Sequence, residues 1–221
     1  MTQYSLQFKP QIDFAEESYI PTDSNKDALD WINKWPNWGK GIYNNIAYLF
    51  GEKSSGKTHL AKIWQAKSGA VFVTNRLLQG QLYFDDETNG YILEDMENFA
   101  EQEKLLFNFL NYIINSKKFL LITSNSAPSK IEFHLPDLKS RINSFLAIKI
   151  KKPDENMIGQ ILLKYFADRQ ISVSSNVINY LIHRIDRSYK NISDVAEKLD
   201  KVSLLQHRKI SIAMIKSVLD I

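Results

Sequence analysis

The sequence of 221 residues contains no cysteine. Disulfide frameworks, thiolate zinc sites and cysteine nucleophiles are therefore excluded. The sequence also lacks an uninterrupted apolar run of the about 20 residues that a membrane-spanning helix needs. Its beginning has neither the basic stretch nor the apolar core of a secretory signal. We therefore expect a soluble, cytoplasmic protein that has no membrane partner.

An excess of charge of one sign is also missing. The chain carries 28 Lys and Arg against 25 Asp and Glu, a net charge of +3, and its lysines are scattered along the whole length. Domains that bind nucleic acid usually gather their basic residues on one face. The composition therefore gives no support for direct, sequence-specific DNA binding. Its 44% hydrophobic and 24% charged residues are typical of a globular protein with a packed core.

Short runs of β-branched and aromatic residues alternate with longer helical patterns. The runs occupy residues 45–50, 70–74, 91–93, 119–123 and 145–150. Each is nearly all apolar, which is typical of strands that helices bury on both faces. Apolar residues recur at helical spacing over residues 60–67 and 101–114. The pattern predicts an α/β fold with a parallel five-stranded sheet flanked by helices.

The strand pattern stops at Pro153, which marks a change of organisation. Four helical patterns follow, over residues 154–169, 175–185, 191–206 and 212–219. We expect a base domain over residues 19–152 and a small all-helical subdomain over residues 153–221. Residues 1–18 show no sustained period, so we interpret them as an extended tail.

The segment from Gly51 to Thr58 fits the pattern G-x-x-x-x-G-K-[ST]. It lies between a predicted strand and a predicted helix, as a phosphate-binding P-loop requires. The two glycines let the backbone N–H groups point inward, Lys57 reaches the outer phosphates, and Thr58 ligates Mg²⁺. The alternative is a plain helix start that binds nothing. The residues expected to contact a nucleotide here are Gly51, Lys53, Ser54, Ser55, Gly56, Lys57, Thr58 and His59.

Polar side chains follow two further predicted strands. Glu94 and Asp95 come directly after residues 91–93, at the position where P-loop proteins hold Mg²⁺ and orient the attacking water. We expect Glu94 nearer the metal and Asp95 nearer the water. Asn125 follows residues 119–123 and could bond to a γ-phosphate or water if its strand lies beside the P-loop strand. The alternatives are solvated acids and a turn residue before Pro128.

The segment Leu-Pro-Asp-Leu-Lys-Ser-Arg over residues 135–141 precedes the last predicted strand. It predicts a short helix at the edge of the sheet that ends with Arg141. An exposed arginine is usually only solvated. A guanidinium directed at a neighbour's phosphates, however, acts as an arginine finger and is worth about 10³ to 10⁵ in rate.

These motifs, in this order and followed by a helical lid, resemble the DnaA-related AAA+ family and are most similar to its shortened Hda branch, which inactivates the replication initiator DnaA. The resemblance covers nearly the whole chain. It implies that ADP or ATP binds with Mg²⁺. It further implies that residues 17–21 wrap the adenine and that Ile20 and Pro21 contact it. It also implies that Arg141 acts in trans to stimulate ATP hydrolysis on DnaA, while intrinsic hydrolysis stays weak. No DNA-reading domain follows the lid, so we expect the regulatory type rather than the initiator itself.

The first residues carry a second feature of this resemblance. The peptide Gln3-Tyr4-Ser5-Leu6-Gln7-Phe8 looks like the family's motif Gln-x-Ser-Leu-x-Leu, which binds the DNA polymerase sliding clamp, the β clamp. An extended peptide can bury Leu6 and Phe8 in an apolar groove while Gln3 makes hydrogen bonds. The resemblance therefore implies the clamp as a partner beside DnaA.

The sequence departs from the family pattern in the lid. Ser193 occupies the position of an arginine that faces the nucleotide phosphates, with Arg187 and Lys190 on the preceding segment as candidate substitutes. Glu94 stands where the family more often has Asp, which shifts the metal or inserts a water.

Two other function classes stay open: a helicase-loader-like ATPase, and a self-contained P-loop kinase, which would need an acceptor pocket and lid arginines. The oligomeric state, a homo-oligomer included, is also open.

Overall fold

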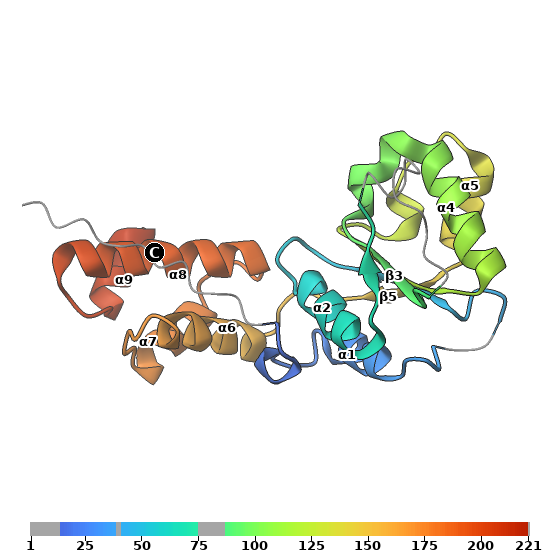
Figure 1. Ribbon diagram of the computed structural model, residues 1–221. Helices are drawn as coiled ribbons and strands as arrows, with labels where there is room; N and C mark the ends of the chain where they lie inside the picture. Colours follow the sequence, from blue (N-terminus) through green and yellow to red (C-terminus); the bar gives the residue numbers. More distant parts are fainter. Residues whose placement is uncertain (1–13, 39–40, 75–86, 221) are drawn as a thin grey trace, which may run out of the picture.

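The computed structural model describes residues 14–38, 41–74 and 87–220. Within these residues, five strands form one sheet in the order β2-β3-β4-β1-β5, and every pair of neighbours is parallel. A separate group of helices lies to one side of this base (Figure 1). The predicted α/β fold with a parallel five-stranded sheet is confirmed. The strands are β1 (Ile46–Phe50), β2 (Val71–Phe72), β3 (Gly90–Leu93), β4 (Phe119–Ser124) and β5 (Leu146–Lys149).

The register brings the carboxyl ends of the three central strands to one edge of the sheet. Phe50 at the end of β1 pairs with Ser124 at the end of β4. Leu93 at the end of β3 pairs with Ile122, which lies two residues before the end of β4 at Ser124. The residues that follow β1, β3 and β4 therefore lie at the same edge, which is where parallel α/β sheets bind ligands.

Helices cover both faces of the sheet (Figure 1). Alternate strand residues point to opposite faces: Tyr48 joins the core beneath α4 and α5, whereas Leu49 joins the core beneath α1 and α2. Helix α4 buries Leu106, Phe109, Leu110 and Ile113, which share one helical face. The helices of the base are α1 (Lys26–Asn33), α2 (Lys57–Ser68), α4 (Glu103–Ser116) and α5 (Pro136–Asn143), with 3-10 helices η1 (Glu16–Ser18), η2 (Met96–Gln102) and η3 (Pro128–Lys130).

The two edge strands differ from the sequence expectation. Strand β2 has two residues instead of the expected five, and Val71 is 44% exposed. Strand β5 leaves Leu146 46% exposed, and Lys149 is exposed as well. An apolar run is buried on both faces only where helices lie above and below it, and the central strands alone meet that condition throughout.

The C-terminal helices have a core of their own. Asp154 caps α6 by accepting a hydrogen bond from the backbone N–H of Met157 at 2.7 Å, and Ser188 and Ser211 cap α8 and α9 in the same way. Helix α7 ends three residues before its expected end, and α8 begins two residues before its expected start. The four helices are α6 (Glu155–Ala167), α7 (Ser175–Ile182), α8 (Tyr189–Gln206) and α9 (Ile212–Leu219).

The helical group is packed against the base. Met157 and Tyr189 are buried in the core that α1 and α2 form with the sheet. The Tyr189 hydroxyl donates to the carbonyl of Lys151 at 3.2 Å, and Lys164 Nζ donates to the carbonyl of Ser18 at 2.8 Å. These contacts attach α6 and α8 to both ends of the base segment.

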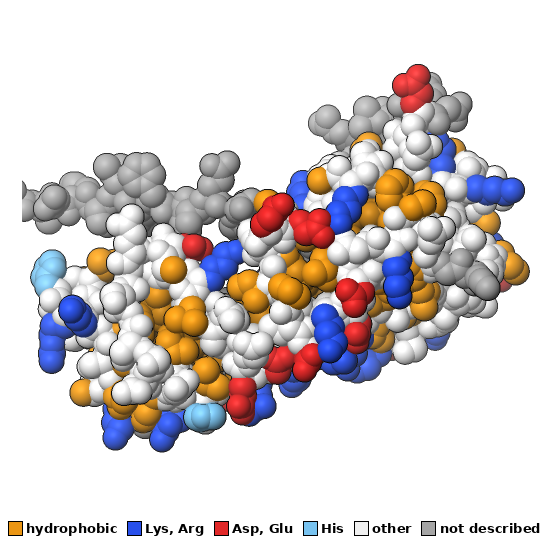
Figure 2. All heavy atoms as spheres, turned by 90° about the horizontal axis from the view of Figure 1, so that it is seen from below, with side chains coloured by type: hydrophobic (Ala, Val, Ile, Leu, Met, Phe, Trp, Pro, Cys, Tyr) orange, Lys and Arg blue, Asp and Glu red, His pale blue; other side chains and the backbone are white. Residues whose placement is uncertain are grey.

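The face of the described part that is seen from below has mixed charge (Figure 2). In the view from below, acidic and basic side chains lie interspersed, and no broad patch of one sign covers this face of the described part (Figure 2). None of the described helices is long and apolar enough to cross a membrane.

Candidate nucleotide-binding site

The loop between β1 and α2 has a backbone that only glycine accommodates at two positions. Gly56 has φ 93°, and a Cβ there would lie 3.3 Å from the Tyr19 ring. A Cβ on Gly51 would lie 2.9 Å from Ser55 Oγ and 3.1 Å from the carbonyl oxygen of Ile150. Ser54 also has a left-handed backbone, with φ 68°. Left-handed residues next to a helix start turn successive N–H groups inward and form an anion-binding concavity.

Lys57, the first residue of α2, is buried beneath this loop. Its Nζ donates to the carbonyls of Gly51 and Glu52, each at 3.0 Å, and to Asn125 Oδ1 at 2.9 Å. Burial lowers the pKa of the Lys57 ammonium. The negative charges of Asp95, Glu97 and Glu94, in that order of strength, oppose this shift. The ammonium is thus held at the carboxyl edge between the loop and the strand ends.

The other loop residues lie at the surface or just beneath it. Lys53, Ser54 and Thr58 are exposed, with Thr58 in the first turn of α2. Ser55 is buried, and its hydroxyl has no hydrogen-bond partner among the described residues. The sequence patterns therefore identified a continuous loop around the start of α2.

His59 connects the loop to the segment before α1. Its Nε2 lies 2.9 Å from the carbonyl oxygen of Ala15, and its ring packs edge-on against Tyr19 with centroids 5.1 Å apart. Tyr19 is buried, Ile20 is half-buried and Pro21 is exposed. Residues 15–21 thus pass beside the start of α2. His59, which was predicted to contact a nucleotide, makes these contacts with Ala15 and Tyr19.

The acids after β3 lie beside Lys57, as the strand order requires. Asp95 has a left-handed backbone, φ 49° and ψ 66°, and its N–H donates to Thr123 Oγ1 at 3.0 Å. Glu94 Oε1 is buried, with no hydrogen-bond partner among the described residues. A carboxylate oxygen without a donor is a ligand that a hard cation prefers. Glu94 therefore fits Mg²⁺, with the Thr58 hydroxyl exposed on the adjoining helix turn.

Asn125 follows β4, and β4 lies beside the P-loop strand β1. Its side chain reaches Lys57, and its backbone N–H donates to Glu97 Oε1. The same carboxylate oxygen accepts from the Ser124 hydroxyl at 2.6 Å. Glu97 was not among the predicted site residues. The sequence signal that could have identified it is a third acid two residues after Asp95. Its contact with the end of β4, however, depends on the backbone turn between Asp95 and Glu97.

Arg141 lies in the last turn of α5, on the face of the sheet opposite α2 (Figure 1). It is half-buried instead of extending into solvent. Its guanidinium donates to Asn111 Oδ1 and lies 4.8 Å from the centre of the Phe107 ring, and both partners belong to α4. No contact joins Arg141 to the P-loop within the described residues. The structure therefore does not bring Arg141 together with the other predicted site residues.

The lid positions that the sequence singled out also make local contacts. Ser193 is exposed, and its hydroxyl donates to the carbonyl of Tyr189 at 3.1 Å. Arg187 donates to Glu155 Oε1 at 2.7 Å, and Lys190 is exposed. Neither cation has a described contact with the P-loop.

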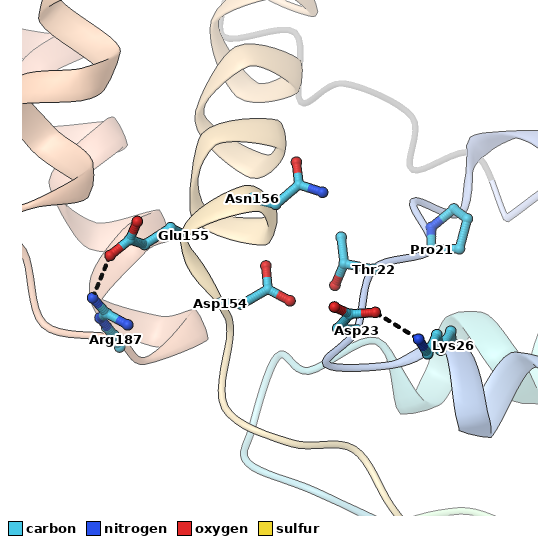
Figure 3. A pocket seen from close by; sticks show the side chains of 8 residues that line it. All are labelled: Pro21, Thr22, Asp23, Lys26, Asp154, Glu155, Asn156 and Arg187. Atoms are coloured by element: carbon cyan, nitrogen blue, oxygen red, sulfur yellow. Dashed lines mark hydrogen bonds and ion pairs between the residues drawn. The ribbon is translucent and has the colours of Figure 1, made fainter.

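A cavity of about 660 Å³ separates the start of α6 from the segment before α1. Figure 3 shows Thr22 and Pro21 across it from Asn156, with Arg187 turned toward Glu155. Its two cations, Lys26 and Arg187, are both paired with carboxylates. Gln3, Leu6 and Phe8, the residues of the expected clamp peptide, lie outside the described residues.

Comparison with known proteins relates these features to a family. The family described as "Hda, lid domain" matches residues 154–219, which contain α6 to α9. An uncharacterized protein of Haemophilus influenzae is 28% identical, with 96% of each chain covered. The chromosomal replication initiator protein DnaA of Buchnera aphidicola subsp. Cinara cedri is 25% identical over 92% of this chain. The match spans 52% of that initiator, so this chain corresponds to about half of it.

Two solved structures share the fold at lower identity. Domain III of DnaA from Thermotoga maritima superposes with a TM-score of 0.75 at 18% identity, covering 95% of this chain and 97% of that domain. The AMPPCP-bound DnaA of Aquifex aeolicus has a TM-score of 0.67 at 16% identity, covering 90% and 67%. The chain is thus similar to Hda/DnaA-related AAA+ proteins. The predicted fold, an AAA+ base followed by a helical lid of the Hda type, is thereby established.

Proposed function

We propose that this Hda-related chain is an adenine-nucleotide-binding regulator of replication initiation that acts on DnaA. The observation that carries the proposal is the Hda lid match over residues 154–219 in a chain that also has a P-loop. Relatives named DnaA, one of them solved with AMPPCP, support an adenine nucleotide as the ligand.

Nucleotide binding would use the carboxyl edge of the sheet. The inward N–H groups of the loop around Gly56 and the start of α2 suit phosphate oxygens. Lys57 would exchange its bonds to backbone carbonyls for stronger bonds to phosphate. Mg²⁺ would be held by Thr58 and Glu94 and would supply charge neutralisation at the phosphates. Ile20 and Pro21, in the segment beside the start of α2, would contact the adenine.

We assign Arg141 to the nucleotide of another protein, DnaA. Its position on the face opposite α2 separates it from this chain's own P-loop. A guanidinium that enters a neighbour's ATP site stabilises the charge that develops during phosphoryl transfer. Asp95 and Asn125, which lie at this chain's own site, would orient water and contact the γ-phosphate there, where hydrolysis is expected to be slow because Ser193 replaces a lid arginine.

The proposed regulator would be loaded on DNA through the sliding clamp, which Gln3, Leu6 and Phe8 would bind, in the cytoplasm where replication takes place.

One reconstituted assay tests the whole proposal. ATP-loaded DnaA is mixed with this protein, with clamp on DNA or without it, and the conversion of bound ATP to ADP is followed. We expect conversion to accelerate only when this protein, clamp and DNA are all present. Equal rates with and without this protein would exclude the proposed function.

A further inference from the structure

Glu97 connects the segment after β3 to the end of β4. It belongs to the first turn of η2, and one carboxylate oxygen accepts two hydrogen bonds. The donors are the Ser124 hydroxyl, at 2.6 Å, and the backbone N–H of Asn125. Hydrogen bonds to an ionised acceptor are about twice as strong as those between neutral groups. A single side chain therefore holds two successive residues at the carboxyl edge.

The backbone of Asp95 makes this contact possible. Its left-handed conformation ends the pairing of β3 and turns the chain into η2, and Asn98 closes the turn by donating to the Asp95 carbonyl at 2.8 Å. The Asp95 N–H is itself bonded to Thr123 on β4. The turn is therefore anchored on β4 at its start, and Glu97, two residues after Asp95, reaches Ser124 at the end of the same strand.

The residues after β4 are also fixed on their other side. Ser124 is fully buried, and its oxygen accepts from the N–H of Ser126 at 3.0 Å. The Tyr48 hydroxyl donates to the carbonyl of Ser126 at 3.0 Å. With Glu97 on the N–H of Asn125, the backbone on both sides of that residue is bonded, which leaves its side-chain amide directed at Lys57.

We propose that Glu97 is a positioning residue: it fixes Asn125 so that the side-chain amide faces Lys57 and the terminal phosphate, and it thereby controls discrimination between nucleoside triphosphate and diphosphate. The inference rests on the proposed nucleotide site. Only a triphosphate presents a γ-phosphate to Asn125, so misplacement of this residue should affect triphosphate binding selectively.

The carboxylate and the hydrogen-bond acceptor can be separated experimentally. Glu97 makes its two hydrogen bonds through Oε1, and Oε2 is buried with no hydrogen-bond partner among the described residues. Glu97→Gln removes the charge but keeps an oxygen that can accept from Asn125. Glu97→Ala removes both. If positioning is the role, Gln should therefore restore most of what Ala loses.

The test is calorimetric titration of the full chain with Mg-ATP and Mg-ADP. We expect Glu97→Ala to weaken ATP about five- to tenfold and ADP less than about twofold, because the loss passes through one net hydrogen bond between Asn125 and the γ-phosphate. In an Asn125→Ala background, Glu97→Ala should change neither affinity further, because the residue through which it acts is gone. Glu101→Ala is the matched control, since Glu101 is an exposed glutamate on the same 3-10 helix.

Several outcomes would overturn the inference. An unchanged ratio of ATP to ADP affinity in Glu97→Ala contradicts it, as does a full effect in the Asn125→Ala background. Hydrogen exchange at the Asn125 amide gives a readout without nucleotide: it should be faster in Glu97→Ala than in Glu97→Gln, and equal rates contradict the contact. If the wild type binds neither nucleotide, the proposed function fails as well. If Glu97→Ala does not fold, Glu97→Asp, which withdraws the carboxylate by one methylene, takes its place.

Discussion

Lys57 Nζ donates a hydrogen bond to Asn125 Oδ1 at 2.9 Å, across 68 residues of sequence. The bond joins the first residue of α2 to the residue after β4, two elements that the strand order brings together because β1 and β4 are neighbours. A buried ammonium next to a polar amide and three carboxylates is suited to phosphate chemistry. The bond therefore identifies the carboxyl edge as the part of the molecule where nucleotide variants should have their effect.

Replacement of Lys57 tests the phosphate contact directly. Lys57→Ala should weaken both Mg-ATP and Mg-ADP about 100-fold, because charge-assisted bonds to the outer phosphates are lost. Calorimetric titration measures the effect. Lys34→Ala, at an exposed position after α1, should leave both affinities at the wild-type value. Equal binding by Lys57→Ala and wild type would exclude this loop as the site.

The two glycines that flank α2 form a matched pair. Both have left-handed backbones, with φ 93° at Gly56 and 69° at Gly69. An alanine at either position should lower the free energy of unfolding by about 1 to 2 kcal/mol, the strain of a left-handed Cβ. Only Gly56→Ala should also weaken nucleotide binding, because only Gly56 belongs to the loop. Denaturant unfolding and titration of both variants check this, and a loss of binding in Gly69→Ala would show that the effect is not specific.

The central fold was predictable because its strands are short, apolar and buried by helices on both faces. For the same reason the residues placed after β1, β3 and β4 could be assigned to one edge. Helix α1 was not predicted, since it has only eight residues and buries only Ala28 and Ile32. The length of β2 was overestimated because an apolar run does not show where strand pairing ends. Of the run at 70–74, only Val71 and Phe72 pair with β3 as strand residues.

Contacts that depend on backbone turns could not be predicted from spacing. Glu97 reaches Asn125 through a turn in which Asp95 adopts a left-handed conformation. This conformation is uncommon for residues other than glycine, so the sequence does not predict it. Arg141 was placed correctly at the end of a short helix, but its attachment to Asn111 and Phe107 required the packing of α5 on α4. The roles of the site residues stay predictions.

Ser193 leads to a prediction about nucleotide preference. Without a lid arginine at the γ-phosphate, the chain should bind Mg-ADP at least as well as Mg-ATP and hydrolyse ATP slowly alone. Arg187 is paired with Glu155, so it has a competing partner. Ser193→Arg should then shift the preference toward ATP. Titration and a phosphate-release assay measure both properties. A wild type that prefers ATP clearly and turns it over fast would mean that Arg187 or Lys190 supplies the missing charge.

The expected clamp peptide can be tested apart from the nucleotide site. Replacing Gln3, Leu6 and Phe8 together by Ala should abolish binding to the sliding clamp, because the apolar contacts and the hydrogen bonds of the motif are all removed. Folding and nucleotide affinity should not change. Replacing Lys9 and Gln11 by Ala in the same segment is the control, since neither belongs to the motif. Unchanged clamp affinity in the triple variant, measured by surface plasmon resonance, would disprove the assignment.

Arg141 should be needed by DnaA and not by this chain. A guanidinium at the bridging and terminal oxygens stabilises the transition state more than the bound substrate, so Arg141→Ala should abolish stimulation of DnaA, a loss of about 10³-fold or more. The affinity of this chain for its own nucleotide should stay near the wild-type value in Arg141→Ala, whereas Lys57→Ala should weaken that affinity. Arg184→Ala is the matched control, because Arg184 stacks on Tyr180 at 3.8 Å on the lid in the same way that Arg141 stacks on Phe107.

Lysine at the same position separates a finger from a simple surface charge. Arg141→Lys keeps the positive charge but loses the planar fork that bonds two oxygens at once, so it should recover little of the stimulation. A merely electrostatic contact with DnaA would tolerate the exchange. Because Arg141 is bonded to Asn111, thermal unfolding of each variant should be compared with wild type, so that a loss of stimulation is not confused with a loosened α5. If Arg141→Ala still converts ATP-loaded DnaA to its ADP form at the normal rate, with clamp on DNA, then the guanidinium takes no part in that hydrolysis.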